Sequence, residues 1–162
     1  MERWRIYCLT PHPNSLLLWA HYAEKHQGIC LEFDVGVEQI GQAQRVVYND
    51  TLPIIGPDDF GDPKALVDAV LLTKSHEWAY EDEYRVLARD HDIDPTFSTK
   101  TQKGYLLLAP GALTAVIAGC SADIVTIKDV LAQCGSTVPL KRAVRVPNQY
   151  HLKIVNHAQV GE

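Results

Sequence analysis

The side chains best suited to chemistry lie between residues 74 and 85. A strand over Tyr80–Ala88 would place Glu81, Glu83 and Arg85 on one face, because alternate residues of a strand point the same way. Arg85 could pair with Glu83, or it could bind a ligand carboxylate or phosphate through two parallel hydrogen bonds. The same row of charges also fits a solvated, ion-paired strand face, or a buried Glu–Arg pair with a structural role.

Aromatic and imidazole side chains gather earlier in the chain, on a helix that apolar spacing predicts over Leu16–His26. Steps of three and four residues turn Trp19, Tyr22 and His26 to one side of this helix, and His21 to another side. Such a face could hold a planar ligand. The alternative is that Trp19 belongs to the core and the histidines lie at its rim.

The spacing of the ligand-type residues does not favour metal or nucleophile chemistry. No Cys-x-x-Cys or His-x-x-x-His pair occurs, so we expect no metal site. No glycine-rich phosphate loop follows a predicted strand, which leaves out the Rossmann and Walker A motifs. We expect reduced, unpaired and buried thiols at all four cysteines, Cys8, Cys30, Cys120 and Cys134, because their flanks are mostly apolar.

The composition is that of an ordinary globular protein, with 162 residues, 46% hydrophobic and 22% charged. Lys and Arg number 15 against 20 Asp and Glu, which gives a formal net charge of −5. A mildly acidic chain lacks the basic surface that neutralises phosphates, so we do not expect nucleic acid as a partner. No apolar run reaches the ~20 residues of a membrane span and no signal-peptide pattern is present. We therefore expect no membrane contact and a cytoplasmic location.

The elements that must position these groups occur in mixed order along the chain. We expect helices over 16–26, over 64–75 with Pro63 as the first helical residue, and over 124–133. We expect strands over 5–9, 29–33, 45–48, 80–88, 105–108, 115–118, 140–146 and 150–155. Residues 51–62 and 89–102, the latter with Pro95 as a breaker, are expected to be loops. This order favours an α+β fold with a mixed, mostly antiparallel sheet and about three helices, in a single domain over residues 1–162.

Two separated motifs resemble those of a known family. The residues that carry the first are Trp19-Ala20-His21-Tyr22 and Gly28-Ile29-Cys30-Leu31-Glu32-Phe33-Asp34, and those that carry the second are Lys74, Trp78, Tyr80-Glu81, Glu83 and Arg85. Both are similar to hallmarks of bacterial domain-of-unknown-function family 2971, and the resemblance covers about residues 7–155. Typical members open with a further strand and an Asn-Asp-Pro loop that this sequence does not contain. Their layout is similar to ADP-ribosyltransferase-like domains, in which a late glutamate polarises a ribose hydroxyl of NAD.

Together, the residues and the resemblance predict a domain that binds or processes a small molecule, with a nucleotide or NAD as the leading class. The cleft would lie between the first helix and the 81–85 strand, so that the two motifs are in contact. The candidate catalytic residues are Glu83 and His21, and the candidate binding residues are Tyr22, Lys74, Trp78, Glu81 and Arg85.

Glu83 would act as a general base or would orient a ribose. Lys74 and Arg85 would bind anions, and Tyr22 or Trp78 would stack on the ligand. The alternative is a non-catalytic binding or assembly module in which these residues form a structural polar network. The cofactor is unknown.

The missing opening segment predicts self-association, because a sheet edge covered in relatives would be bare here. We expect a two-fold homodimer, whose contact lies near the strand Arg3–Leu9. Trp4 and Tyr7 are the candidate buried anchors, since aromatic residues dominate interface cores. The alternative is a monomer in which the loop Thr51–Asp62 covers the same surface.

Overall fold

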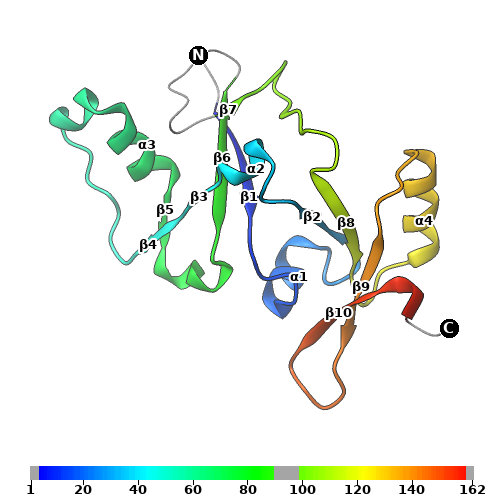
Figure 1. Cartoon of the computed structure of the whole chain (residues 1–162). Helices are drawn as coiled ribbons and strands as arrows, with labels where there is room; N and C mark the ends of the chain where they lie inside the picture. The colour runs from blue at the N-terminus through cyan, green and yellow to red at the C-terminus, as the bar shows by residue number, and fades with distance from the viewer. Residues whose placement is uncertain (1–3, 90–98, 160–162) are drawn as a thin grey trace. The chain divides into compact units, whose positions relative to one another are not determined.

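The computed structural model describes residues 4–89 and 99–159, and the chain divides into two compact units. Unit 1 comprises Met1–Pro11 and Gly36–Ala109, and unit 2 comprises His12–Val35 and Pro110–Glu162. The predicted α+β class is confirmed, because mixed sheets with antiparallel strands occur together with α-helices (Figure 1). The single domain stays a prediction. Within the described residues no helix is both long enough and apolar enough to span a membrane.

Unit 1 is built around a central strand, β6 (Tyr84–Arg89). Strand β1 (Arg5–Leu9) pairs with β6 in antiparallel fashion, and the short strands β3 (Gln44–Arg45) and β7 (Thr99–Lys100) also pair with it. A second, two-stranded sheet joins β4 (Val47–Asn49) and β5 (Thr73–Ser75) in parallel. The helical segments of this unit are α2 (Glu38–Gly41), η1 (Pro57–Gly61), α3 (Pro63–Leu71) and η2 (His76–Glu81).

Helix α3 contributes one buried residue, Val67, to the core of unit 1. It begins at Pro63, as predicted, where the missing N–H costs no hydrogen bond, and the Asp62 carboxylate accepts from two backbone N–H groups of the first turn. Its buried residue Val67 packs with Leu72 and Leu87, and Leu87 lies on one face of β6. The helix ends at Leu71, before the predicted end near residue 75, because the chain then enters β5.

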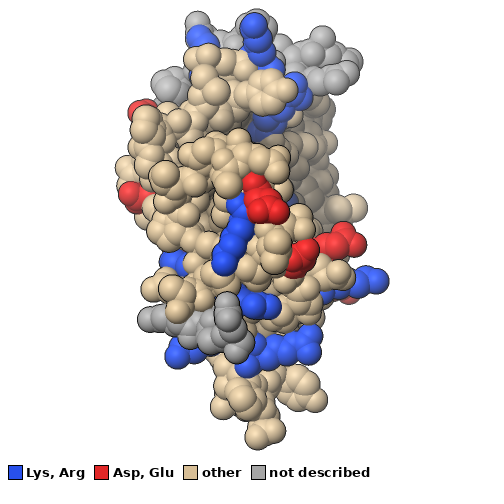
Figure 2. Space-filling model, turned by 90° about the vertical axis from the view of Figure 1, so that its right-hand side faces the viewer, with Lys and Arg blue, Asp and Glu red and all other residues tan. Residues whose placement is uncertain are grey.

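Unit 2 contains a four-stranded sheet in the order β10–β9–β8–β2. The strands are β2 (Ile29–Phe33), β8 (Leu113–Ala118), β9 (Leu140–Arg145) and β10 (Leu152–Asn156), and the helical segments are α1 (Leu16–Tyr22), α4 (Ile124–Gln133) and η3 (His157–Gln159). The parallel pair β8–β9 is connected through α4, and the predicted closing pair is confirmed as the antiparallel hairpin β9–β10. On the face drawn in Figure 2, Lys and Arg side chains lie at several places, among them the lower end, just above the tip of the hairpin.

Helix α1 is shorter than predicted and ends at Tyr22. Glu24, Lys25 and His26 follow in the left-handed region, with φ of 47°, 51° and 71°. His26 therefore lies outside the helix, and the prediction that it shares a helical face with Trp19 and Tyr22 is wrong. Trp19 itself is buried in the core of unit 2, where its indole N–H donates to a backbone carbonyl at 2.7 Å.

Other predictions need smaller corrections. The predicted strand over 45–48 is divided between β3 and β4, and the predicted strand over 105–108 is reduced to one bridge between Gln102 and Tyr105. Tyr105 is 72% exposed, so the apolar run there is not buried as predicted.

All four cysteines are free, but Cys8 and Cys134 are exposed, which corrects the expectation that every thiol is buried. The predicted breaker Pro95 lies outside the described residues.

Candidate functional site

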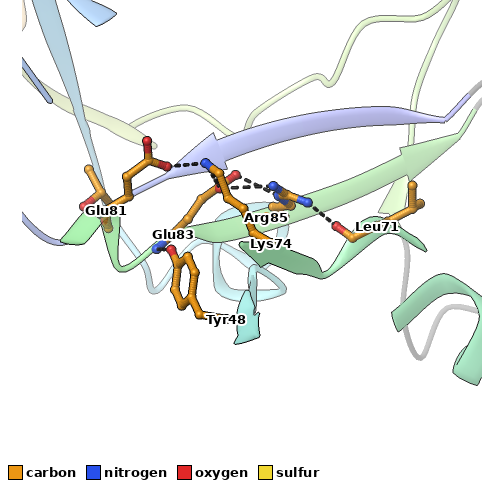
Figure 3. Close-up of polar contacts among 7 residues, drawn as sticks. Tyr48, Leu71, Lys74, Glu81, Glu83 and Arg85 are labelled. Carbon is orange, nitrogen blue, oxygen red and sulfur yellow. Dashed lines mark hydrogen bonds and ion pairs between the residues drawn. The ribbon is translucent and has the colours of Figure 1, made fainter. Parts of the chain in front are cut away.

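Four of the predicted site residues form one polar network in unit 1 (Figure 3). The Lys74 ammonium contacts the Glu81 carboxylate and lies 3.0 Å from Oε2 of Glu83. Arg85 approaches Glu83 with two nitrogens, Nε at 2.7 Å from Oε1 and Nη2 at 3.1 Å from Oε2. The two glutamates are 4% and 5% exposed, so both carboxylates are buried, Glu81 against Lys74 and Glu83 between Lys74 and Arg85.

The local fold that brings Glu81 into this network differs from the prediction. The predicted strand over Tyr80–Ala88 begins only at Tyr84, because the chain before β6 forms the 3-10 helix η2. Of the three charged residues only Arg85 lies on the strand: Glu81 ends η2, and Glu83 lies between η2 and β6. The hydroxyl of Ser75 caps η2, and Asp82 ends it in a left-handed conformation with φ of 43°. This turn directs the Glu81 side chain back toward Lys74 on the preceding strand β5.

Three further residues, Leu71, Tyr48 and Thr10, are hydrogen-bonded to members of the same network. Arg85 Nη1 donates to the carbonyl of Leu71, the last residue of α3, and thereby satisfies a carbonyl that has no partner within the helix. The Glu83 N–H donates to the hydroxyl of Tyr48 on β4 at 2.8 Å. The hydroxyl of Thr10, just after β1, donates to the Glu81 carbonyl at 2.7 Å. The network therefore joins β1, β4, α3, β5, η2 and β6.

Two members of the network were missed by the sequence analysis. Cys8 stands directly opposite Arg85 in the β1–β6 pair, and the Glu83 carboxylate contributes to a raised pKa of its thiol. Tyr48 stands opposite Lys74 in the β4–β5 pair. The two residues can be identified only from the register of these strand pairs, which the sequence analysis did not predict. The flanks of Cys8 resemble those of the other cysteines, and a tyrosine in a short strand is ordinary.

The surroundings fix the charge of Glu83. Burial alone would raise the pKa of its carboxyl, but hydrogen bonds from Arg85, Cys8 and Lys74 outweigh burial and lower the pKa from 4.5 to about 2. Partial burial and the neighbouring Glu83 raise the pKa of the Cys8 thiol to about 11. For Lys74, burial acts to lower the pKa of the ammonium, and hydrogen bonds to Glu81 and Glu83 overcome it and raise that pKa. The carboxylate is thus ionised and the thiol protonated at neutral pH.

An exposed aromatic pair lies beside the network. The Lys74 ammonium is 5.0 Å from the centroid of the Trp78 ring, a cation–π distance. The rings of Trp78 and Tyr80 lie 6.0 Å apart with an interplanar angle of 36°, and the two residues are 37% and 38% exposed. Trp78 therefore lies beside the lysine that pairs with Glu81 and Glu83, and part of the aromatic pair faces solvent.

The remaining predicted site residues, His21 and Tyr22, belong to the other unit. They lie at the end of α1, with their rings 6.2 Å apart in an edge-on arrangement, and Tyr22 is 66% exposed. The expected contact between the two motifs, and the cleft between them, stay predictions. Among residues 4–89 and 99–159 no group of three His, Cys, Asp or Glu is placed to hold a metal ion.

Comparisons of the chain with family models, with curated proteins and with solved structures find no match. The resemblance to the bacterial family therefore stays a prediction that rests on the two motifs. The function has to be argued from the geometry of the network itself.

Proposed function

We propose that this chain is a non-catalytic assembly module of a cytoplasmic bacterial protein, in which the Lys74–Glu83 network is an internal scaffold. The observation that carries the proposal is the closed surroundings of Glu83. Both carboxylate oxygens accept hydrogen bonds from cations, Oε1 from Arg85 and Oε2 from Lys74 and Arg85. A carboxylate with a pKa near 2 has little affinity for a proton at neutral pH, so it is a poor general base. Its remaining role is to hold cations and backbone in place.

The energetics of buried ions support the scaffold interpretation. A charge taken out of water is costly unless opposite charges and hydrogen bonds surround it, and removal of one partner leaves the others uncompensated. Here two anions, Glu81 and Glu83, are matched by two cations, Lys74 and Arg85. The matched charges bind together elements that are far apart in sequence, which is what a scaffold requires.

The surface that this scaffold would present to a second copy is β1. Within the described residues β1 is an edge strand of its sheet, and its side chains Ile6 and Tyr7 are 41% and 40% exposed. Bare strand edges promote pairing with another chain. Trp4 is not available as an anchor, because it packs against the core of unit 1 and stacks under the guanidinium of Arg89. The homodimer would therefore be built on Ile6 and Tyr7, with β1 paired to β1 of the second copy.

Hydrogen–deuterium exchange tests this proposal. An edge strand that pairs with a second copy gains partners for the N–H groups on its outer side, so alternate amides of β1 should exchange more slowly as the protein concentration rises. Tyr7→Glu places a charge in the contact and should remove the concentration dependence. Exchange of β1 that is the same at all concentrations would contradict the proposal.

A second candidate function is the binding of a planar small molecule, for which the exposed Trp78–Tyr80 pair is the supporting observation. Aromatic rings beside a cation are typical of sites that stack nucleobases. A ligand that binds only the native state raises the unfolding temperature. A thermal-shift screen with NAD and nucleoside monophosphates, repeated on Trp78→Leu, tests it. A shift in the parent protein that the variant lacks supports binding at this pair, and no shift in either contradicts it.

A further inference from the structure

The β9–β10 hairpin of unit 2 carries an unusual concentration of positive charge. Residues 140–156 contain four basic side chains and no Asp or Glu, in a chain whose net charge is −5. The basic residues are Lys141, Arg142, Arg145 and Lys153. Figure 2 shows Lys and Arg side chains gathered above the hairpin tip. Such a surface favours an anionic partner.

Only one of these cations has a counter-ion among the described residues. Lys141 lies 2.8 Å from both oxygens of Glu32, across the sheet. Arg142, Arg145 and Lys153 form no ion pair within residues 4–89 and 99–159. Lys153 and Arg145 are exposed and Arg142 is partly buried. These three charges are available to a partner.

One strand of the same hairpin lies at the edge of its sheet. Strand β10 is the last strand of its sheet, and no described strand pairs with its outer side. The Val146 N–H donates to the carbonyl of His151, which fixes the alternation of the antiparallel ladder. By this alternation Lys153 and Val155 bond to β9, whereas Leu152, Ile154 and Asn156 direct their backbone N–H and C=O groups outward. An extended peptide could therefore continue the sheet.

The positions of the cations determine which side chains of a bound peptide would be acidic. Lys153 and Arg142 share one face of the hairpin, because Lys153 is opposite Val144 and Arg142 is opposite Val155 in the register. Arg145 is opposite Leu152 and so belongs to the other face. Alternate residues of a strand added beside β10 would lie on the face of Lys153 and Arg142. We propose that the edge of β10 binds an extended acidic peptide of a partner protein, with carboxylates at every second residue.

Two other interpretations explain only part of this arrangement of cations and strand edge. One is a strand edge protected against pairing with further strands, and the other is a binding site for nucleic acid. A lysine on an edge strand can serve only to prevent pairing with further strands, but that role does not need the unpaired Arg142 on the neighbouring strand. A single-stranded nucleic acid would use the cations, but its backbone has no N–H groups to match the outward carbonyls of β10. An acidic peptide would use both the cations and the strand edge, and its binding site contains no residue of the assembly surface proposed for unit 1.

Fluorescence anisotropy with labelled probes tests this inference on the full chain. The main probe is a peptide of about ten residues in which Glu and Thr alternate, since an edge strand of this length can pair with no more. The first control replaces every Glu by Gln. The second replaces two central Thr by Pro, which removes N–H groups and leaves the charge unchanged. The third is a deoxythymidine oligonucleotide of similar length. We expect the Glu–Thr peptide to bind at least about tenfold more tightly than each control.

Variants of the chain then locate the site. Lys153→Glu should weaken binding of the Glu–Thr peptide by about tenfold or more, and Arg145→Glu, on the opposite face, should weaken it less. Lys128→Glu makes the same charge change on α4, at an exposed position outside the hairpin, and should change the affinity by less than about twofold. Circular dichroism checks that each variant is folded, and the comparison of peptides with the parent protein needs no variant at all. The inference is overturned by the absence of saturable binding, by equal binding of the proline peptide or the oligonucleotide, or by equal losses in all three variants.

Discussion

Glu83 shows how a buried carboxylate can be held ionised without acting as a base. Its oxygens accept hydrogen bonds from Arg85 and Lys74. Each of these hydrogen bonds stabilises the charged form, which is why the pKa falls although burial opposes the fall. The same contacts that would make Glu83 slow to take a proton make it important for stability.

Glu83→Gln should destabilise the protein strongly. The amide has nearly the same shape as the carboxylate, but it leaves the buried charges of Lys74 and Arg85 without their shared anion. We expect a loss of about 3 kcal/mol in the free energy of unfolding, measured by urea denaturation. Glu77→Gln, at an exposed position of η2, is the control and should change stability by less than about 0.5 kcal/mol. Equal effects of the two substitutions would contradict a scaffold role for Glu83.

The lowered pKa of Glu83 predicts a dependence of stability on pH. Because the folded pKa, about 2, lies below the ordinary 4.5, the unfolded chain takes up the proton first as the pH falls. The contribution of Glu83 is therefore complete above about pH 5 and is lost progressively toward pH 2. Urea denaturation at about pH 6 and pH 3 should show that the parent protein loses more stability on acidification than Glu83→Gln. Parallel losses in the two proteins would show that Glu83 has an ordinary pKa.

Cys8 gives a chemical probe of the same contact. A thiol whose pKa is raised to about 11 contains little thiolate at pH 8, and the thiolate is the form that reacts with iodoacetamide. Although Cys8 is exposed, we expect its alkylation to be slow and to become faster in Glu83→Gln, because the anion that disfavours the thiolate is then absent. Mass spectrometry measures the rate at each site. Exposed Cys134 in unit 2 is the control, and its rate should not change. An unchanged rate at Cys8 would contradict its contact with Glu83.

At this scale the sequence predicted part of the network. It indicated Lys74, Glu81, Glu83 and Arg85, but it placed Glu81 on a strand, whereas a 3-10 helix brings it there. It missed Cys8, whose role depends on a strand partner 77 positions away, as the pairing of Cys8 with Arg85 shows (85 − 8 = 77). The charge and spacing of residues within one segment can be predicted from that segment alone. The register between strands that are distant in sequence cannot be predicted in this way.

Among the elements, the end of α1 shows most clearly where local patterns fail. Apolar spacing predicted a helix to His26, yet the chain leaves the helix after Tyr22 and passes through three consecutive left-handed residues. The reason lies in the packing of the turn on the end of β8. The Gly119 N–H donates to the Gly28 carbonyl at 3.0 Å, and a Cβ at Gly119 would lie only 2.0 Å from the His26 carbonyl oxygen. Tertiary contact therefore overrides helix propensity here.

Gly119→Ala tests this close approach. The added methyl group cannot fit without displacing the backbone of His26, so we expect a loss of about 3 kcal/mol in the free energy of unfolding. Gly61→Ala is the matched control, because nothing lies within 4 Å of the position that its Cβ would take. It should leave stability within about 1 kcal/mol of the parent protein. If Gly119→Ala is as stable as Gly61→Ala, the turn does not pack on β8 as described.

The helices with clear capping signals were predicted best. Asp62-Pro63 at the start of α3, and Asp123 with Gly135 around α4, mark ends that depend only on neighbouring residues. Strand limits were predicted less well. The two-residue strands β3 and β7 exist only because β6 lies beside them, and the apolar run after Gln102 has no strand partner among the described residues.

For the molecule as a whole, the sequence predicted the α+β class but not the division of the chain. Each unit is assembled from two separate stretches, so that the first strand and the last hairpin belong to different units. No change of composition marks the three points, after Pro11, Val35 and Ala109, where the chain passes from one unit to the other. The division depends on which strands pair across long separations in sequence. This long-range pairing could not be predicted from a single sequence.

Assembly of the whole molecule is proposed to run through β1, with the buried network as its scaffold. Exposed Ile6 and Tyr7 on an edge strand are the features that a second copy would cover. Tyr7→Glu keeps the length of the strand and adds a charge at the contact, so it should prevent assembly. Lys128→Glu, an exposed substitution in unit 2, is the control and should leave assembly unaffected.

Light scattering over a range of protein concentrations tests assembly through β1 most directly. One chain has a mass of 18.1 kDa. We expect about twice this mass for the parent protein and for Lys128→Glu at micromolar concentration, and the mass of a single chain for Tyr7→Glu. A parent protein that stays at the mass of one chain, or a Tyr7→Glu variant that keeps the doubled mass, would contradict assembly through β1.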